Sequence, residues 1–303
     1  MPFYIPPISR RRFLAGGLAA GAGLCLGNEA FAFAKQEADP HAWALLSDPH
    51  IWEKKTEQAH DVNMAANLEK VRAEVLALER LPGALLVNGD CAYKDGQPGD
   101  YQVFTDLMKP FSAAGIPIHL TLGNHDHRQR FWESLKNAPA GDPPVENKHV
   151  SFVPGERANL VLLDSLDQVN QTSGLLGEKQ LAWLAKTLDV HADKPAIVIS
   201  HHHPQGKLIQ TKGLVDTQEL LDVLLPRKQA KALFFGHTHH WSVSEIEGLH
   251  CVNLPPVAYL FIPGDPNGWV NLSLADDRAT VELHALDKQH PLHGDKHELK
   301  WRA

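Results

Sequence analysis

Residues 84–90 read Ala-Leu-Leu-Val-Asn-Gly-Asp, an apolar run that ends at a glycine followed at once by a carboxylate. A short apolar run bounded by turn-forming residues is typical of a buried strand. Gly89 allows a sharp backbone turn that aims Asp90 inward from the end of that strand. The stretch therefore predicts a strand that presents a potential metal ligand at its carboxyl end.

The same arrangement recurs along the chain, where apolar runs at residues 42–46, 116–122, 196–199 and 233–235 are each followed by a polar motif. In open α/β sheets, ligands bind beyond the carboxyl ends of the strands. We therefore expect the polar side chains to gather at one edge of a sheet. They are Asp48 and His50 in SDPH, Asn124 in GNHD, the run His201-His202-His203, and His237 and His239 in GHTH.

Helices are predicted between these strands. Leu68, Val71 and Val75 recur at helical spacing, which predicts an amphipathic helix over roughly residues 63–80. A second helix is expected over residues 177–188, for the same reason. Strand and helix thus alternate along the chain, as in α/β folds.

The residue types suit a two-metal centre that cleaves phosphoesters. This chemistry requires the phosphate charge to be neutralised, water to be made nucleophilic and the leaving oxygen to be stabilised, and two metal ions roughly 3.5–4 Å apart meet all three needs. Asp90 is the natural bridge between two ions. The other ligands divide into two shells, with Asp48, His50 and His239 around one ion and Asn124, His201 and His237 around the other.

Carboxylate oxygen and imidazole nitrogen suit Fe, Mn or Zn, whereas an all-oxygen set would suit Mg or Ca. His125, adjacent to a ligand and on the substrate side, is the candidate donor of a proton to the leaving alkoxide. Residues 95–100, 127–130 and 206–213 are expected to shape the substrate pocket. Arg128 is interpreted either as a phosphate contact or as a partner in a surface salt bridge.

Composition is that of an ordinary globular protein, with 303 residues, 43% hydrophobic and 21% charged. The formal net charge of −7 argues against a general positive field, and no basic groove for nucleic acid is evident. His290, His293 and His297 lie in a polar tail that we expect to be a solvated face. We predict one catalytic domain over residues 35–303.

Within that domain, the motifs occupy residues 41–262, and a hairpin and tail fill residues 263–303. Apolar residues alternate with polar ones over residues 270–274 and 281–285, on either side of a turn-like Asp-Asp, which predicts the hairpin. We expect the hairpin to be an edge or second-sheet element that packs on the catalytic domain.

The N-terminal segment resembles an export signal. Ser9-Arg10-Arg11-Arg12-Phe13-Leu14 matches a twin-arginine signal, and residues 14–26 form an apolar stretch too short to span a bilayer. Small-x-small patterns predict cleavage near Phe33 or Lys35, so residues 1–34 would be a signal peptide. These features predict recognition by the twin-arginine export machinery, no stable membrane anchor, and a periplasmic or secreted protein.

Two cysteines would remain after cleavage, Cys91 and Cys251. An oxidising compartment permits a disulfide between them, but two small buried thiols are the favoured interpretation.

Together, the pattern Asp-x-His, Gly-Asp, Gly-Asn-His-Asp, His and Gly-His-x-His resembles the calcineurin-like metallophosphoesterases over residues 41–262. LLDS at residues 162–165, QLAWL at residues 180–184 and HHHP at residues 201–204 are similar to the class III cyclic nucleotide phosphodiesterases. This resemblance implies a four-layer α/β/β/α fold, a dinuclear Fe or Mn centre at the strand ends, and hydrolysis by a metal-bridging hydroxide. His201 matches the family's ligand best, with His202 as the alternative.

Residues 89–93, Gly-Asp-Cys-Ala-Tyr, also match the Gly-Asp-x-x-Tyr of purple acid phosphatases. In those enzymes the first motif lacks the histidine present here as His50, so Tyr93 is expected to be a packed residue rather than an iron ligand.

Two classes of function follow. The leading hypothesis is an exported phosphoesterase acting on a small-molecule diester or monoester, with the diester favoured. The alternative is a catalytically silent, exported metal-binding or sensing protein, against which His125 and the complete ligand set argue.

Overall fold

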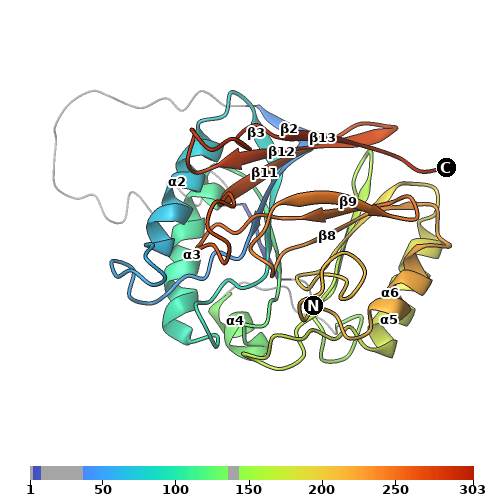
Figure 1. Cartoon of the computed structure of the whole chain (residues 1–303), viewed down its shortest axis with the longest axis horizontal. Helices are drawn as coiled ribbons and strands as arrows, with labels where there is room; N and C mark the ends of the chain where they lie inside the picture. The colour runs from blue at the N-terminus through green and yellow to red at the C-terminus, as the bar shows by residue number, and fades with distance from the viewer. Residues whose placement is uncertain (1–2, 8–36, 136–142) are drawn as a thin grey trace.

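The computed structural model describes residues 3–7, 37–135 and 143–303. Two sheets lie against each other, with helices α2 and α3 on one outer side and α5 and α6 on the other (Figure 1). This arrangement confirms the predicted four-layer α/β/β/α sandwich.

Within the described residues, the first sheet has the strand order β1-β4-β3-β2-β11-β12-β13. β2, β3 and β4 are parallel, so their carboxyl ends meet at the same edge. The strands are β1 (Phe3–Ile5), β2 (Ala38–Ser47), β3 (Leu81–Asn88), β4 (Ile118–Thr121), β11 (Gly268–Leu274), β12 (Arg278–Ala285) and β13 (Lys296–Lys300).

The second sheet has the order β5-β6-β7-β8-β10-β9 over the same described ranges. β6, β7 and β8 are parallel neighbours, and β10 runs parallel to β8. The strands are β5 (Ser151–Val153), β6 (Asn159–Leu162), β7 (Ala196–Ile199), β8 (Ala230–Phe235), β9 (Ser242–Ile246) and β10 (Leu249–Asn253).

The predicted helices form with shifted ends. α2 (Met64–Leu76) begins where the Asn63 side chain accepts a hydrogen bond from the Ala66 amide at 2.7 Å. It ends at Leu76 rather than residue 80 because residues 77–80 form the turn that leads into β3. α5 (Glu178–Val190) covers the other predicted helix. The remaining helices, not predicted, are α3 (Pro98–Ala113), α4 (Arg128–Ser134) and α6 (Thr217–Leu224).

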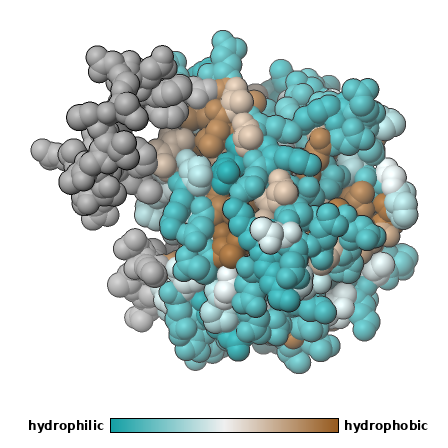
Figure 2. All heavy atoms as spheres, turned by 90° about the vertical axis from the view of Figure 1, so that its left-hand side faces the viewer, coloured by the Kyte–Doolittle hydropathy of each residue, from teal (hydrophilic) through white to brown (hydrophobic). Residues whose placement is uncertain are grey.

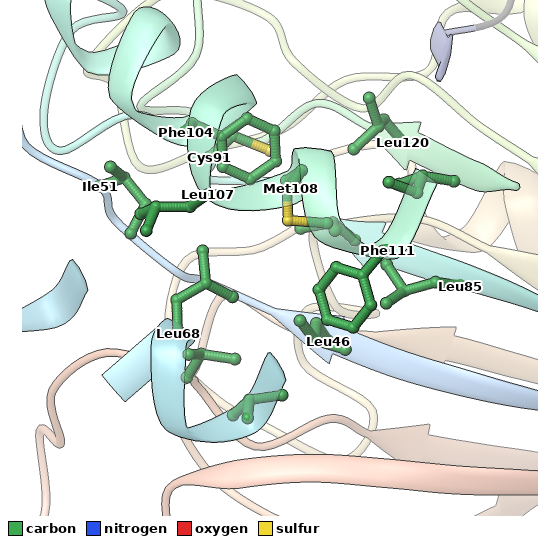
Figure 3. Packing of buried hydrophobic residues seen from close by; sticks show 14 of the residues in the cluster. Leu46, Ile51, Leu68, Leu85, Cys91, Phe104, Leu107, Met108, Phe111 and Leu120 are labelled. Atoms are coloured by element: carbon green, nitrogen blue, oxygen red, sulfur yellow. The ribbon is translucent and has the colours of Figure 1, made fainter. Parts of the chain in front are cut away.

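In the described part of the chain, buried side chains form three hydrophobic clusters that correspond to the three spaces between the four layers. Figure 3 shows the outer cluster of the first sheet, where Leu46 and Leu85 meet Phe104, Met108 and Phe111 of α3. These helical residues follow the spacing of one apolar face, a signal that could have predicted α3.

The second cluster fills the space between the two sheets, where Leu45 and Leu86 join Ile197 and Phe234. In the third cluster, α5 and α6 pack on the outer face of the second sheet. Burial of so much aliphatic and aromatic surface holds the sheets face to face, and this fixes the relative position of their strand ends.

The C-terminal region differs from the prediction. The hairpin does form, but β11 pairs with β2 and β12 pairs with β13, so the hairpin is an interior part of the first sheet. The prediction of an edge or second-sheet element was therefore wrong. The polar tail is not simply a solvated face, because His297 lies in the edge strand β13 and contacts Asp295 at 2.9 Å.

Most of the predicted export signal lies outside the described residues. Its first residues, Phe3–Ile5, form β1 and pair antiparallel with Ile118–Leu120 of β4. The prediction did not include this pairing. Among the residues described, no helix combines the length and apolar character needed to cross a bilayer.

Cys91 and Cys251 are buried and each is a free thiol. They lie in different hydrophobic clusters, Cys91 beside the first sheet's outer helices and Cys251 under α5 and α6. The interpretation as two buried thiols is confirmed.

Candidate metal centre

All seven predicted ligand residues lie at one place, where the strand ends of the two sheets meet. Asp48 and His50 follow β2, Asp90 follows β3 and Asn124 follows β4 in the first sheet. His201 follows β7, and His237 and His239 follow β8, in the second sheet. Each sheet therefore contributes part of the centre, and the sandwich brings the parts together.

The side chains group into two sets around Asp90. Ligand atoms of Asp48, His50 and His239 lie within 4.8 Å of one another, as do those of Asp90, His201 and His237. Asp90 also belongs to a third group, with His50 and His125. Asp90 Oδ2 is 3.6 Å from His50 Nε2 and 3.3 Å from His201 Nε2, so its carboxylate lies between the two sets.

The backbone at these positions is strained. Asp48, His50, Asp90, His237 and His239 all have positive φ, between 45° and 68°. Non-glycine residues adopt this left-handed region at a cost, and such strain concentrates at functional sites. Side chains of the centre also pack so closely against two neighbouring glycines that no larger residue fits there. A Cβ added to Gly123 would lie 2.1 Å from Asp90 Oδ1, and one added to Gly89 would lie 2.4 Å from His201 Nδ1.

Main-chain carbonyls orient the imidazole rings. The Nδ1 atoms of His50, His201 and His239 contact the carbonyl oxygens of Tyr93, Asn88 and Tyr259 at 3.2, 2.9 and 2.7 Å. A ring nitrogen that donates to a carbonyl leaves the other nitrogen as a lone-pair donor toward a metal. His237 uses Nε2 instead, 3.1 Å from the Lys212 carbonyl oxygen, which leaves its Nδ1 toward the centre.

Several buried ligand atoms have no hydrogen-bond partner among the described residues, namely Asp48 Oδ1, Asn124 Oδ1 and His201 Nε2. Unpaired polar atoms are costly to bury, and metal coordination is one way to satisfy them. The mixed oxygen and nitrogen donors fit transition metals. The residues present therefore fit a dinuclear metal site.

Burial and neighbouring charges set the protonation states of the side chains at the centre, and they favour neutral rings at His50 and His237 and an ionised carboxylate at Asp48. Burial, together with neighbouring charges, lowers the pKa of His50 and of His237 to about 3, so both rings are neutral at pH 7. Burial raises the pKa of Asp48, but His201 and His239 outweigh burial and lower it to about 2. For His201, burial lowers the pKa, yet Asp90 and Asp48 raise it to about 10, so this ring carries a positive charge at pH 7 and would release its proton on binding a metal ion. The carboxylates thus attract positive charge to the centre.

Asp126 connects the loops that carry Asp90 and Asn124. Its Oδ2 accepts hydrogen bonds from the Gly123 and Cys91 amides at 3.0 and 3.2 Å, and its Oδ1 accepts from the Ala92 amide at 3.1 Å. The Tyr101 hydroxyl of α3 also contacts Oδ1, at 3.2 Å. The sequence interpretation gave Asp126 no role, although it stands in the Gly-Asn-His-Asp motif.

Of the three consecutive histidines, His201 lies in a ligand set and His202 does not. His202 is fully buried and its Nδ1 is 2.8 Å from Ser165 Oγ. The ring of Tyr93 packs against Trp52, with ring centres 5.0 Å apart, while its main chain contacts His50. This placement agrees with a packed tyrosine.

A cavity of about 490 Å³ opens over the centre. Its lining includes His125, half-buried and 5.1 Å from His50 between ring centres. From the expected pocket segments, Ile209, Thr211 and Lys212 line it, whereas residues 95–100 and 127–130 are not part of this lining. Lining residues that the sequence interpretation missed are Thr172, Thr238, His240, Phe261 and Ile262.

Arg128 does not line the cavity. Its guanidinium donates to both carboxylate oxygens of the buried Asp164 at 2.8 and 2.9 Å. Of the two interpretations, the ion pair is the correct one, and one partner is buried rather than on the surface.

Comparison with known proteins agrees with this geometry. The sequence model of the calcineurin-like phosphoesterases matches residues 43–241, which contain all seven residues of the centre. The chain belongs to the calcineurin-like phosphoesterase family. As a calcineurin-like phosphoesterase, it is a metal-dependent phosphoric ester hydrolase.

Curated relatives of this calcineurin-like phosphoesterase include phosphodiesterases. The 3′,5′-cyclic adenosine monophosphate phosphodiesterase CpdA of Haemophilus influenzae is 28% identical over 72% of this chain and 77% of its own length. The glycerophosphodiester phosphodiesterase GpdQ of Enterobacter lignolyticus is 25% identical over 71% of this chain and 77% of its own length.

Solved structures show the same fold. A dimetal phosphatase from Danio rerio superimposes with a TM-score of 0.66 at 16% identity, covering 87% of this chain and 100% of that one. A purple acid phosphatase from yellow lupin superimposes with a TM-score of 0.61 at 14% identity, covering 86% of this chain and 53% of that one.

Proposed function

We propose that this protein is an exported, dinuclear-metal phosphodiesterase that hydrolyses small-molecule phosphodiesters in preference to phosphomonoesters. The observation that supports it most is the pair of ligand sets on either side of the Asp90 carboxylate, beneath a cavity lined by His125. The names of the curated relatives, one for a cyclic nucleotide and one for glycerophosphodiesters, favour a diester substrate.

The residues have distinct roles in this proposal. Asp48, His50 and His239 would hold one ion, Asn124, His201 and His237 would hold the other, and Asp90 would contribute to both. Fe, Mn or both suit this donor set, and Zn is compatible. When bound, the two ions neutralise the phosphate's charge, activate water and stabilise the leaving oxygen.

His125 supplies the proton that the leaving alkoxide needs. Its Nδ1 contacts the Lys94 carbonyl oxygen, which fixes the ring and leaves Nε2 free. Its main-chain amide donates to Asp90 Oδ1 at 2.8 Å, so the proton donor and the bridging carboxylate are held in fixed relative positions. A donor placed in this way favours the departure of an alcohol with a high pKa.

The export part of the proposal rests on Ser9-Arg10-Arg11-Arg12-Phe13-Leu14. Recognition by twin-arginine machinery, which moves folded proteins, would place a metal-loaded enzyme in the periplasm or outside the cell. In either location the enzyme would not meet the cytoplasmic pool of cyclic nucleotides. We therefore propose diester hydrolysis without assigning a particular physiological diester.

Turnover tests this proposal. The full chain, produced with Mn or Fe, is assayed with bis(4-nitrophenyl) phosphate and with 4-nitrophenyl phosphate. We expect the diester to be cleaved faster, and Asn124→Ala to abolish its cleavage. Gln218→Ala, which removes an amide from an exposed position of α6, serves as the control and should retain activity.

A preference for the monoester would instead favour a phosphatase. If the wild-type protein binds two metal ions per chain yet hydrolyses neither ester, the silent metal-binding alternative is correct.

A further inference from the structure

Two adjacent large apolar side chains are exposed in the cavity above the metal centre. Phe261 is 59% exposed and Ile262 is 55% exposed, and both line the cavity that also contains His50 and His125. Large apolar side chains tend to be buried, and exposed ones grouped at a cavity mark sites of binding. The side of the molecule that was on the left in Figure 1, where α2 lies, is turned toward the viewer in Figure 2. It is mostly hydrophilic, with small, separate hydrophobic areas.

The ring of Phe261 is held at the metal centre. It stacks on His239 with ring centres 4.1 Å apart and an interplanar angle of 15°. One ring face is therefore covered by a residue of the first ligand set, and the exposed surface of Phe261 faces the cavity.

The loop that carries these residues is anchored on both sides. Before Phe261, the Tyr259 carbonyl oxygen contacts His239 Nδ1 at 2.7 Å. After it, the Asp265 amide donates to the Ile262 carbonyl oxygen at 3.2 Å, and Asp265 Oδ2 contacts His240 Nδ1 at 2.7 Å. A surface fixed in this way loses little conformational entropy when a ligand binds to it.

Two residues of the cavity lining differ in chemistry. Phe261 lies beside His239, in the ligand set of Asp48 and His50. The exposed Lys212 also lines the cavity, and its carbonyl oxygen contacts His237, in the other ligand set. The lining therefore combines an aromatic ring with a basic residue whose ammonium suits a phosphate or another anionic group.

We propose that Phe261, flanked by Ile262, binds a planar ring of the substrate, such as a nucleobase or an aryl group, by stacking. Aromatic faces bind planar rings in offset stacks, and every nucleobase has such a face. His125 lies next to His50, and His50 contacts His239, so the stacked ring belongs to the leaving alcohol. This inference rests on the proposed function and defines its substrate class as esters with a planar substituent.

Direct binding tests the inference without turnover. Isothermal calorimetry on the Mn-loaded full chain compares adenosine 5′-monophosphate with ribose 5-phosphate, which differ by the base. We expect the wild type to bind the nucleotide roughly tenfold more tightly. Phe261→Ala should reduce this ratio to about one while its affinity for ribose 5-phosphate stays unchanged, and Phe261→Trp should retain the ratio.

Val190→Ala is the matched control, because Val190 is 65% exposed at the end of α5 and outside the cavity lining. It should leave the ratio unchanged. A wild-type ratio near one, a ratio that survives in Phe261→Ala, or an equal loss of both affinities in that variant would each overturn the inference. Failure of the proposed function is seen separately, as absence of diester turnover by the wild type.

Discussion

Arg128 and Asp164 form a bidentate ion pair between the two sheets of the sandwich, with Nε–Oδ2 and Nη2–Oδ1 distances of 2.8 and 2.9 Å. Arg128 starts α4, after β4 of the first sheet, and Asp164 follows β6 of the second. Burial raises the pKa of Asp164, but the charge and hydrogen bonds of Arg128, together with the charge of Lys148 and the His149 amide, outweigh burial and lower it. The ion pair therefore stabilises the contact between the sheets.

Arg128→Ala should reduce the free energy of unfolding by about 2–3 kcal/mol at pH 7, because it leaves a buried carboxylate without its cation. Since the pKa of Asp164 is lowered by folding, this stabilisation is fully present above the unfolded value of about 4 and is lost as the pH falls through the folded value. Urea denaturation at a series of pH values measures both effects.

Arg278→Ala is the control, because its partner Asp277 is exposed, and we expect a change below about 0.5 kcal/mol. An equal effect of the two substitutions would contradict the structural role of Arg128.

Asp126→Asn should destabilise the fold by about 2–4 kcal/mol and weaken metal binding. An asparagine can accept through only one oxygen, whereas Asp126 accepts from three main-chain amides and the Tyr101 hydroxyl. Chemical denaturation and metal titration measure the two effects. Asp95→Asn should change neither, because the only side chain that bonds Asp95 in the described structure is that of the exposed Gln97. Full metal affinity in Asp126→Asn would show that the loops need no such connection.

The fold and the ligand residues can be predicted from the sequence for a common physical reason. β7 was predicted with correct ends, because the apolar run Ala196–Ile199 is buried on both faces and stops at polar residues. Motifs that follow such strands must lie at the sheet edge, and this rule predicts that Asp48, Asp90 and Asn124 lie together at the edge of the first sheet. His201 follows a strand of the second sheet, so the packing of the two sheets is what brings it beside Asp90.

What the sequence did not reveal depends on contacts distant in the chain. The alternation in β11 is the same for an edge strand as for an interior one, and only pairing with β2 and β12 decides between them. Similarly, Phe261 stands in a loop with no motif, and only the fold stacks it on His239.

His201→Ala and His202→Gln should have different effects on metal content. His201 lies in the set with Asp90 and His237, so its loss should leave about one ion per chain instead of two. His202 contacts Ser165, and a glutamine there should keep both ions. Elemental analysis of the purified proteins measures the difference, and loss of an ion only in His202→Gln would reassign the ligand to His202.

His125→Asn should slow hydrolysis to an extent that depends on the leaving group. If His125 protonates the departing oxygen, its loss should cost about 10²–10⁴-fold in kcat for a diester of an ordinary alcohol. A nitrophenolate needs little protonation, so the same variant should cleave bis(4-nitrophenyl) phosphate at a rate much closer to that of the wild type. The two substrates are compared in wild type and variant with metal content measured in parallel, because His125 also lies near Asp90. An equal loss with both leaving groups at unchanged metal content would show that His125 acts by another means than proton donation.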